Sequence, residues 1–302
     1  MASPAVPVRT LLFAPATHER RLARLPSCGA DATVIDLEDA VADEEKVGAR
    51  RLVPPALAAG GPGLRCVRVN GVDTGLLFDD LTAVVGPDLD AVVVPKVDSP
   101  DLLRIIDAQL GRQEAQLSLP PGSIGLFALV ETAAGVQRAG EIAHGAPGRV
   151  RQLVFGLGDF SADIGVEPSE QGLELLHARS ALVVASRAAG LPAPLDGPYL
   201  RLHDPEALEA DTRRSKALGL RGRVVIHPEQ VAPVHRVVSG LSDAELRRAQ
   251  RVVREFERAE SAGDASITVD GEFVDYPIYR HRLALLEQHR RATDDEGAEW
   301  TA

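Results

Sequence analysis

The sequence lacks features that would place it in several classes of protein. Its two cysteines, Cys28 and Cys66, are too few for a disulfide framework and match no zinc-ligand spacing. No run reaches the roughly 18 apolar residues of a membrane-spanning helix, and the N-terminal stretch MASPAVPVRT lacks the apolar region of a signal peptide. These absences predict a cytoplasmic protein with no membrane partner.

Positive charge is also scarce. The 33 lysines and arginines stand against 44 aspartates and glutamates, which gives a formal net charge of -11. No stretch combines clustered basic residues with aromatic ones, so binding to nucleic acid is not expected. An anionic ligand would need arginines placed locally. With 302 residues, 45% of them hydrophobic, the chain can form one large domain or two small ones with a real core.

The apolar residues occur in short β-branched runs separated by helical patterns. Most runs are almost continuously apolar, as strands covered on both faces of a parallel sheet are. Eight such units predict a (β/α)8 TIM barrel, an α/β fold. A doubly wound sheet is the alternative, but no GxGxxG follows the first run. The eight runs are RTLLFAP, ATVIDLED, LRCVRVN, AVVVPKV, GLFALVET, QLVFGLGD, a weak LDGPYL and RVVIHPE.

The chain continues beyond the eighth run, and its pattern then changes. A charged helical stretch, SDAELRRAQRVVREFERAE, precedes a hairpin pattern with a DG turn and a further helix near Pro277. We therefore predict a barrel domain over residues 1–235 and a C-terminal helical and hairpin extension over residues 236–302.

Polar residues gather where the predicted strands end. In a barrel these ends form one rim, which carries the active site. Glu131 and Asp159 follow consecutive strands, so their carboxylates can converge, and two oxygen ligands with room for water and substrate are typical of Mg2+. The alternative for either acid is an arginine partner or a helix cap. The strand-end residues are Asp36, Glu38, Asp39, Arg68, Asn70, Lys96, Glu131, Thr132, Asp159 and His227.

Three residues of this rim can each be interpreted in more than one way. Arg68 can hold a substrate carboxylate or carbonyl, can pair with the acids of DLED, or can do both, since Asp36 and Asp39 would orient it for substrate. Lys96 can form a Schiff base with a keto acid or bind substrate as a cation. His227, followed by Pro228, is as compatible with a structural hydrogen bond as with catalysis.

The order of these motifs resembles one known family. RTLLFAP, VIDLEDAVADEEKVGAR, VRVNGVDT, VVPKVDS, ALVETAAGV, FGLGDFSADIG, LDGPYLRLHDPEAL and VIHPEQV follow one another as in the citrate lyase β-subunit-like and malyl-CoA lyase family. The resemblance runs from about Arg9 to Asp275, and it identifies the family without identifying a substrate.

The resemblance implies a TIM barrel that binds Mg2+ through Glu131 and Asp159 and contacts substrate through Arg68. It implies CoA thioesters as substrates and assembly into homotrimers or hexamers. The C-terminal segment would close over a neighbouring subunit and deliver Asp275 as acid or base; from the residues alone, Asp275 would be a cap at the end of the hairpin.

Together these observations predict a Mg2+-dependent carbon-carbon lyase, or the reverse condensation, acting on a carboxylate-bearing 3-hydroxyacyl-CoA such as malyl-CoA to give an acyl-CoA and a 2-oxo acid. Asp275 and Arg68 are the predicted catalytic residues. Glu38, Asp39 and Lys96 join Arg68 as substrate-binding residues, and Arg21 and Arg24 are predicted to contact CoA phosphates.

Three alternatives remain open at this point: a citrate lyase β-type subunit that acts on an acyl-carrier thioester, a malyl-CoA-type thioesterase, and a Schiff-base aldolase through Lys96. Two departures from the family pattern concern the pocket and the metal motif. ATHER replaces the usual glycine and asparagine after the first strand, which changes the CoA or acyl pocket, whereas DFSADIG keeps the metal aspartate.

Overall fold

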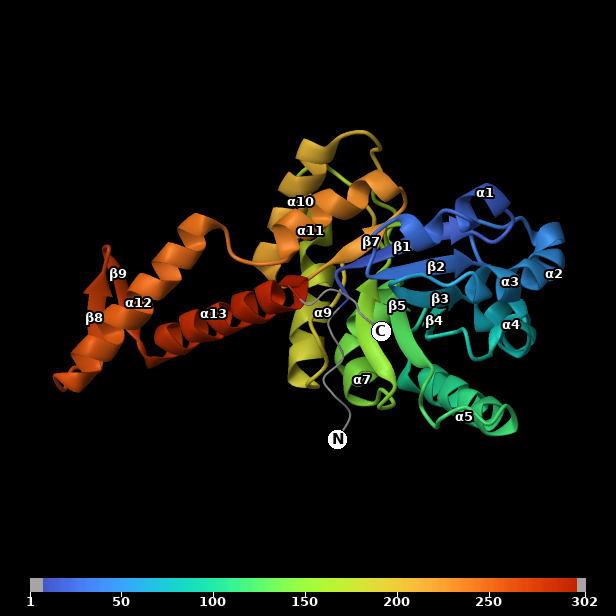
Figure 1. Ribbon diagram of the computed structural model, residues 1–302, viewed down its shortest axis with the longest axis horizontal. Helices are drawn as coiled ribbons and strands as arrows, with labels where there is room; N and C mark the ends of the chain where they lie inside the picture. The colour runs from blue at the N-terminus through green and yellow to red at the C-terminus, as the bar shows by residue number, and fades with distance from the viewer. Residues whose placement is uncertain (1–7, 298–302) are drawn as a thin grey trace. The chain divides into compact units, whose positions relative to one another are not determined.

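A parallel sheet of seven strands forms the centre of the larger unit of the protein. The computed structural model describes residues 8–297, so the outer ends of both predicted domains, residues 1–7 and 298–302, lie outside the described residues. Neighbouring strands follow the order β6-β5-β4-β3-β2-β1-β7 (Figure 1). The strands are β1 Thr10–Pro15, β2 Ala32–Asp36, β3 Leu64–Arg68, β4 Ala91–Val94, β5 Gly125–Val130, β6 Val150–Phe155 and β7 Arg223–Val225.

The sheet forms a nearly closed barrel, in which β1 pairs with both β2 and β7. Between β6 and β7 only isolated bridges remain, from Leu195 to Val154 and from Asp196 to Arg223. The weak run LDGPYL is therefore two bridging residues and not a full strand. Proline has no N–H to donate to a ladder, and Pro194 and Pro198 flank the bridging pair.

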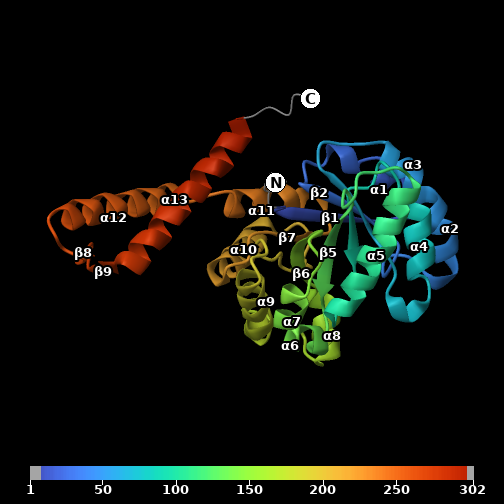
Figure 2. The same cartoon turned by 90° about the horizontal axis from the view of Figure 1, so that it is seen from below.

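Helices surround the outside of this sheet (Figures 1 and 2). They are α1 Glu19–Leu22, α2 Lys46–Ala49, α3 Val53–Ala58, α4 Leu77–Val84, α5 Pro100–Gln116, α6 Ala133–Gln137, α7 Ala139–His144, α8 Leu157–Asp163, α9 Leu176–Ala188, α10 Pro205–Leu218 and α11 Val231–Val238. Short 3-10 turns lie at η1 Leu25–Ser27, η2 Asp43–Glu45, η3 Arg50–Leu52, η4 Val72–Thr74, η5 Leu173–Leu175 and η6 Pro228–Gln230.

The strands are buried on both faces, which explains their continuously apolar sequences. One cluster is built almost wholly from strand residues and fills the barrel interior; it includes Leu11, Val34 and Phe127. A second cluster joins the outward-facing strand residues, such as Leu12, to helix residues, such as Leu103. Alternate residues of one strand thus enter different cores, as the period-2 geometry of a barrel strand requires.

The second compact unit begins at Ser239. It contains α12 Asp243–Ser261, the antiparallel pair β8 Ser266–Val269 and β9 Glu272–Asp275, and α13 Tyr276–Gly297. Ser242 and Glu245 form a capping box at the start of α12. The hairpin turns at Asp270 and Gly271, whose φ angles of 52° and 80° are those of a type I′ turn.

This unit has a small core of its own. Val252, Phe256, Val269 and Val274 are buried together, and the ring of Tyr279 stacks on Phe256 with centroids 4.8 Å apart. Within residues 8–297, no helix has the length and apolar character needed to cross a membrane.

Candidate metal and substrate site

Charged side chains meet at the carboxyl ends of five neighbouring strands of the barrel. Because the strand order is β6-β5-β4-β3-β2, the loops that follow these strands lie side by side along one rim. The rim carries Asp36, Glu38 and Asp39 after β2, Arg68 at the end of β3, Lys96 after β4, Glu131 after β5, and Asp159 after β6.

Glu131 is a buried carboxylate at the end of an apolar strand. It follows β5 directly and is only 1% exposed. Its Oε1 accepts a hydrogen bond from the backbone N–H of Lys96 at 2.8 Å. Gly156 makes room for it, because a Cβ at that position would overlap Oε2 of Glu131. The next residue, Thr132, caps α6 by accepting a hydrogen bond from Gly135.

Asp159 approaches Glu131 from the neighbouring loop. It is the third residue of α8 rather than the last residue of the preceding strand, because β6 already ends at Phe155. Its side chain is 39% exposed, so it faces solvent at the rim. A buried and a partly exposed carboxylate thus lie close enough at neighbouring strand ends for the charge of Asp159 to act on Glu131.

The rim holds more negative charge than its cations balance. Burial, followed by the charges of Asp159 and Glu38, raises the pKa of Glu131 to about 8. Burial also raises the pKa of Glu38 to about 7; Arg68 and Lys96 oppose that rise, and Asp39 adds to it. Desolvation and neighbouring like charges both disfavour an ionised carboxylate.

Arg68 is held in place by three carboxylates. It donates from Nε and Nη2 to the two oxygens of Asp36 at 2.7 and 2.6 Å, and from Nη1 to Asp39 at 3.2 Å. Its guanidinium also lies over the ring of Phe13, 5.2 Å from the centroid. Burial lowers the pKa of Arg68, but its hydrogen bonds with Asp36 and the surrounding negative charges leave it above the usual value.

The contact between Arg68 and Glu38 is electrostatic rather than a hydrogen bond. Nη1 of Arg68 lies 2.7 Å from Oε2 of Glu38, which is the distance of a close ion pair. Among the described residues, Oε2 has no hydrogen-bond donor although it is buried. This oxygen is therefore paired with the charge of Arg68 and lacks only a directed hydrogen bond.

Lys96 links the two buried glutamates. Its backbone N–H binds Glu131, and its ammonium donates to Oε1 of Glu38 at 2.8 Å. Burial lowers the pKa of this ammonium, but the hydrogen bond to Glu38 and the charges of Glu38, Asp39 and Asp159 outweigh that effect and raise it. Lys96 is therefore a protonated cation at neutral pH.

A hard divalent cation fits these residues. Across residues 8–297, no three His, Cys, Asp or Glu side chains form a ready metal cage. Mg2+ does not need one, because it commonly takes one or two carboxylates and keeps several waters. The raised pKa of Glu131 and the partly exposed Asp159 beside it indicate a site that favours added positive charge.

The predicted CoA-binding arginines lie in the segment that joins β1 to β2. Arg21 is in α1, Arg24 follows that helix, and both are exposed. Neither forms an ion pair within the described part of the chain. Their charges are accordingly available to an anionic ligand.

Asp275 belongs to the C-terminal unit. It is the last residue of β9, and its Oδ1 accepts a hydrogen bond from the backbone N–H of Ile278 at 3.3 Å, in the first turn of α13. This is the capping contact that the residue pattern alone suggests.

His227 has a structural contact of the same kind. Its Nδ1 accepts the backbone N–H of Glu229 at 3.4 Å, which caps η6.

Two residues of the site were not singled out from the sequence. Gly156 has a recognisable signal, because a glycine between an apolar run and a strand-end acid indicates a close approach of another group. Phe13, under the guanidinium of Arg68, has none, since it reads as an ordinary strand residue.

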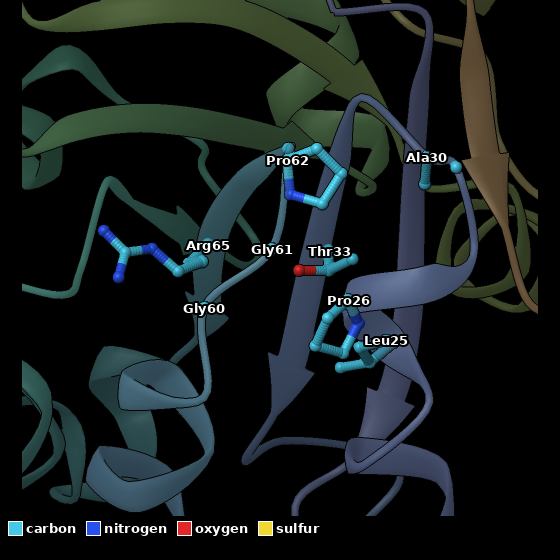
Figure 3. A pocket seen from close by; sticks show the side chains of 10 residues that line it. Leu25, Pro26, Ala30, Thr33, Gly60, Gly61, Pro62 and Arg65 are labelled. Atoms are coloured by element: carbon cyan, nitrogen blue, oxygen red, sulfur yellow. The ribbon is translucent and has the colours of Figure 1, made fainter. Parts of the chain in front are cut away.

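A small cavity lies at the opposite, amino-terminal ends of β2 and β3 (Figure 3). Its volume is about 10 Å3, and Leu25, Pro26, Gly61 and Arg65 are among its lining residues. That volume holds a single water molecule at most, so the cavity is no substrate site.

Comparison with known proteins gives consistent matches along the chain. Residues 9–228 match the family model described as HpcH/HpaI aldolase/citrate lyase. The citrate lyase subunit beta of Leuconostoc mesenteroides subsp. cremoris is 32% identical, over 96% of each chain. A (3S)-malyl-CoA thioesterase of Cereibacter sphaeroides is 36% identical, over 91% of this chain and 92% of the relative.

Among solved structures, the chain is similar to the protein CitE from Mycobacterium tuberculosis in complex with magnesium, acetoacetate and coenzyme A. The TM-score is 0.75 at 25% identity, and the match covers 95% of this chain and all of that one.

Proposed function

Since the chain belongs to the HpcH/HpaI aldolase/citrate lyase family, we propose that it is a Mg2+-dependent carbon-carbon lyase, or the reverse condensing enzyme. Its substrate would be a carboxylate-bearing 3-hydroxyacyl-CoA of the malyl-CoA type, which cleaves to an acyl-CoA and a 2-oxo acid. The observation that carries the proposal is the pair Glu131 and Asp159, whose negative charge the cations of the rim leave uncompensated.

Glu131 and Asp159 would hold the metal. Glu131 is held by the N–H of Lys96 and fits the space that Gly156 leaves. Asp159 is partly exposed, so a metal bound to it would remain in contact with solvent. When bound, Mg2+ supplies Lewis-acid polarisation of the 2-oxo acid's carbonyl. The magnesium in the related Mycobacterium tuberculosis complex supports this assignment.

Arg68 would stabilise the oxygen on which negative charge develops. Its side chain is already fixed by Asp36, Asp39 and Phe13, so little reorganisation accompanies the reaction. Such preorganised donors contribute about 3–4 kcal/mol to a barrier when one is removed. Glu38, Asp39 and Lys96 would shape the anionic end of the pocket around Arg68.

Asp275 would act as the acid or base. In the condensing direction its carboxylate removes a proton from the α-carbon of the acyl-CoA, and the resulting enolate attacks the carbonyl carbon of the 2-oxo acid. In cleavage the base takes the proton of the 3-hydroxyl, the carbon-carbon bond breaks to give the 2-oxo acid and the acyl-CoA enolate, and the α-carbon of that enolate then takes up a proton. We propose that the extension carrying Asp275 closes over a neighbouring copy in a homo-oligomer, a trimer or hexamer, and that Arg21 and Arg24 contact CoA phosphates.

Two alternative functions are supported by the relatives. A thioesterase would release free CoA without carbon-carbon cleavage, and the Cereibacter relative bears that name. A citrate lyase β-type subunit would require an acyl-carrier partner, and the Leuconostoc relative is named as such a subunit. For a Schiff-base aldolase, by contrast, the Lys96 ammonium would have to lose a proton that Glu38, Asp39 and Asp159 stabilise.

The test is a mass-spectrometric assay of the purified protein with a panel of acyl-CoAs and 2-oxo acids, in Mg2+ and in EDTA. The expected result is a Mg2+-dependent adduct that Glu131→Gln and Asp159→Asn abolish. Asp88→Asn, on the amino-terminal side of the barrel, is the matched control that keeps activity. Free CoA without an adduct would favour the thioesterase; no product despite bound Mg2+ would favour the partner-dependent subunit.

A further inference from the structure

Lys96 has an unusual backbone conformation for a residue with a side chain. Its φ angle is 50°, in the left-handed region that glycine tolerates and other residues generally avoid. The turn lies two residues after the end of β4, and the next residue, Val97, donates its N–H to the carbonyl oxygen of Leu129 at 3.0 Å. This reversal lets the N–H of Lys96 point away from the sheet ladder and reach Glu131 instead.

The other end of Lys96 lies among the remaining acids of the rim. Its ammonium is 2.8 Å from Glu38, 3.9 Å from Asp39 and 4.0 Å from Asp159. One residue therefore holds one proposed metal ligand through its backbone and places a positive charge beside the other proposed metal ligand. The aliphatic stem that joins the two groups keeps the ammonium tethered to the rim.

We infer that Lys96 is a positioning residue with two opposite effects on metal binding. Its left-handed backbone turn presents Glu131 to the metal and favours binding, whereas its tethered ammonium occupies part of the acidic rim and competes with the metal. The inference rests on the proposed Mg2+ site and extends it. It predicts that the two effects can be separated by substitution at this one position.

The two effects depend on two properties of residue 96: the backbone conformation that it tolerates and the charge that it carries. Glycine and asparagine both tolerate the left-handed conformation and carry no charge, so Lys96→Gly and Lys96→Asn keep the turn and remove the competing cation. Valine is also uncharged, but its β-branched side chain disfavours the turn. Lys96→Arg keeps a cation at the rim.

The expected order of Mg2+ affinity follows directly. Lys96→Gly and Lys96→Asn bind Mg2+ about fivefold more tightly than the parent, the scale of one partly exposed charge pair. Lys96→Val binds about tenfold more weakly than Lys96→Gly, the scale of one strained backbone residue. Lys96→Arg stays close to the parent.

The experiment is calorimetric titration of the full chain with MgCl2 alone, without substrate, for the parent and the four variants. Ser118 provides a matched control, because its φ angle is 56° and it lies in the exposed turn after α5. Ser118→Gly relieves and Ser118→Val adds strain at a left-handed residue, as the Lys96 variants do, but at a position away from the rim. Both Ser118 variants should leave Mg2+ affinity unchanged. Thermal unfolding of every variant confirms that the proteins compared are folded.

Equal Mg2+ affinities for Lys96→Gly, Lys96→Asn and Lys96→Val would overturn the backbone effect. Affinities for Lys96→Gly and Lys96→Asn at or below that of the parent would overturn the competition by the ammonium. A parent chain that binds no Mg2+ would overturn the proposed metal site itself, and that outcome is visible before any variant is compared.

Discussion

A single methyl group at Gly156 should disrupt the candidate metal site. Gly156 follows β6 and leads into α8, and its backbone N–H donates to the carbonyl oxygen of Val130. An alanine Cβ there would overlap Oε2 and Cβ of Glu131 and would lie 3.0 Å from its Cδ. Since the Glu131 stem is enclosed and only 1% exposed, the carboxylate has to leave its position beside the N–H of Lys96.

The magnitude of the effect can be worked from this geometry. Forcing a methyl into a closely packed position costs about 1–3 kcal/mol of unfolding free energy, which lowers Tm by roughly 2–12 °C for a unit of this size. Displacing a metal ligand from the group that orients it weakens metal binding by about 10- to 100-fold. Gly156→Ala should therefore show both losses together.

Calorimetric titration with MgCl2 and thermal unfolding measure these two quantities on the same protein. Gly158→Ala is the matched control, because nothing lies within 4 Å of its added Cβ and it sits in α8, the helix that Gly156 precedes. Alanine at an exposed helical position should raise the unfolding free energy by up to about 1 kcal/mol. The reasoning fails if Gly156→Ala binds Mg2+ as the parent does, or if Gly158→Ala weakens binding equally.

Three further predictions concern other parts of the chain. Asp275→Asn should retain Mg2+ affinity by titration but lose at least about 100-fold in turnover, as expected for a general acid or base; retained turnover would remove Asp275 from the mechanism. Burial would raise the pKa of Asp31, but its hydrogen bonds and charge interactions with His235 and Arg9 outweigh burial and lower that pKa. Ionised Asp31 therefore adds to the unfolding free energy above the unfolded pKa of about 4, and this contribution declines as the pH falls below it. In urea unfolding from pH 7 to pH 2.5, the stability difference between the parent and Asp31→Asn should shrink below about pH 4, and a constant difference would contradict this. Arg223→Met should lower the unfolding free energy by about 3–5 kcal/mol, because it leaves Asp196 and Asp211 buried without this partner. A loss below about 1 kcal/mol would refute a stabilising role for these ion pairs beside the incomplete β6–β7 side of the barrel.

The barrel and the position of its rim could be predicted because they depend on local pattern. Continuous apolar runs indicate strands covered on both faces, and the order of the runs then places the residues after each strand on one edge. Glu131 and Asp159 are brought together for this reason. The exception is LDGPYL, where Pro194, Gly197 and Pro198 prevent a ladder although the flanking pattern suggests a strand.

The contacts within the rim could not be predicted in the same way. The left-handed turn at Lys96 has no glycine to indicate it, and it depends on a carboxylate that lies 35 residues away in the sequence. Asp159 is preceded by glycines at 156 and 158, which could have indicated that the strand ends early and a helix begins. For Arg68 the sequence allows a substrate, an acidic partner or both, and only side-chain geometry shows that its acidic partners already use most of its donors.

Charge balance connects these contacts to the choice between reaction types. Asp36, Glu38, Asp39, Glu131 and Asp159 are five carboxylates, and Arg68 and Lys96 are the two cations beside them. Ionised together, they carry three more negative than positive charges, and a divalent cation removes most of that excess. A Schiff-base mechanism would instead take a proton from Lys96 and increase the excess, at a position where its acidic neighbours already raise its pKa. The same electrostatics that make Lys96 a poor nucleophile make its rim a good site for Mg2+, because both follow from one surplus of buried and half-buried carboxylates.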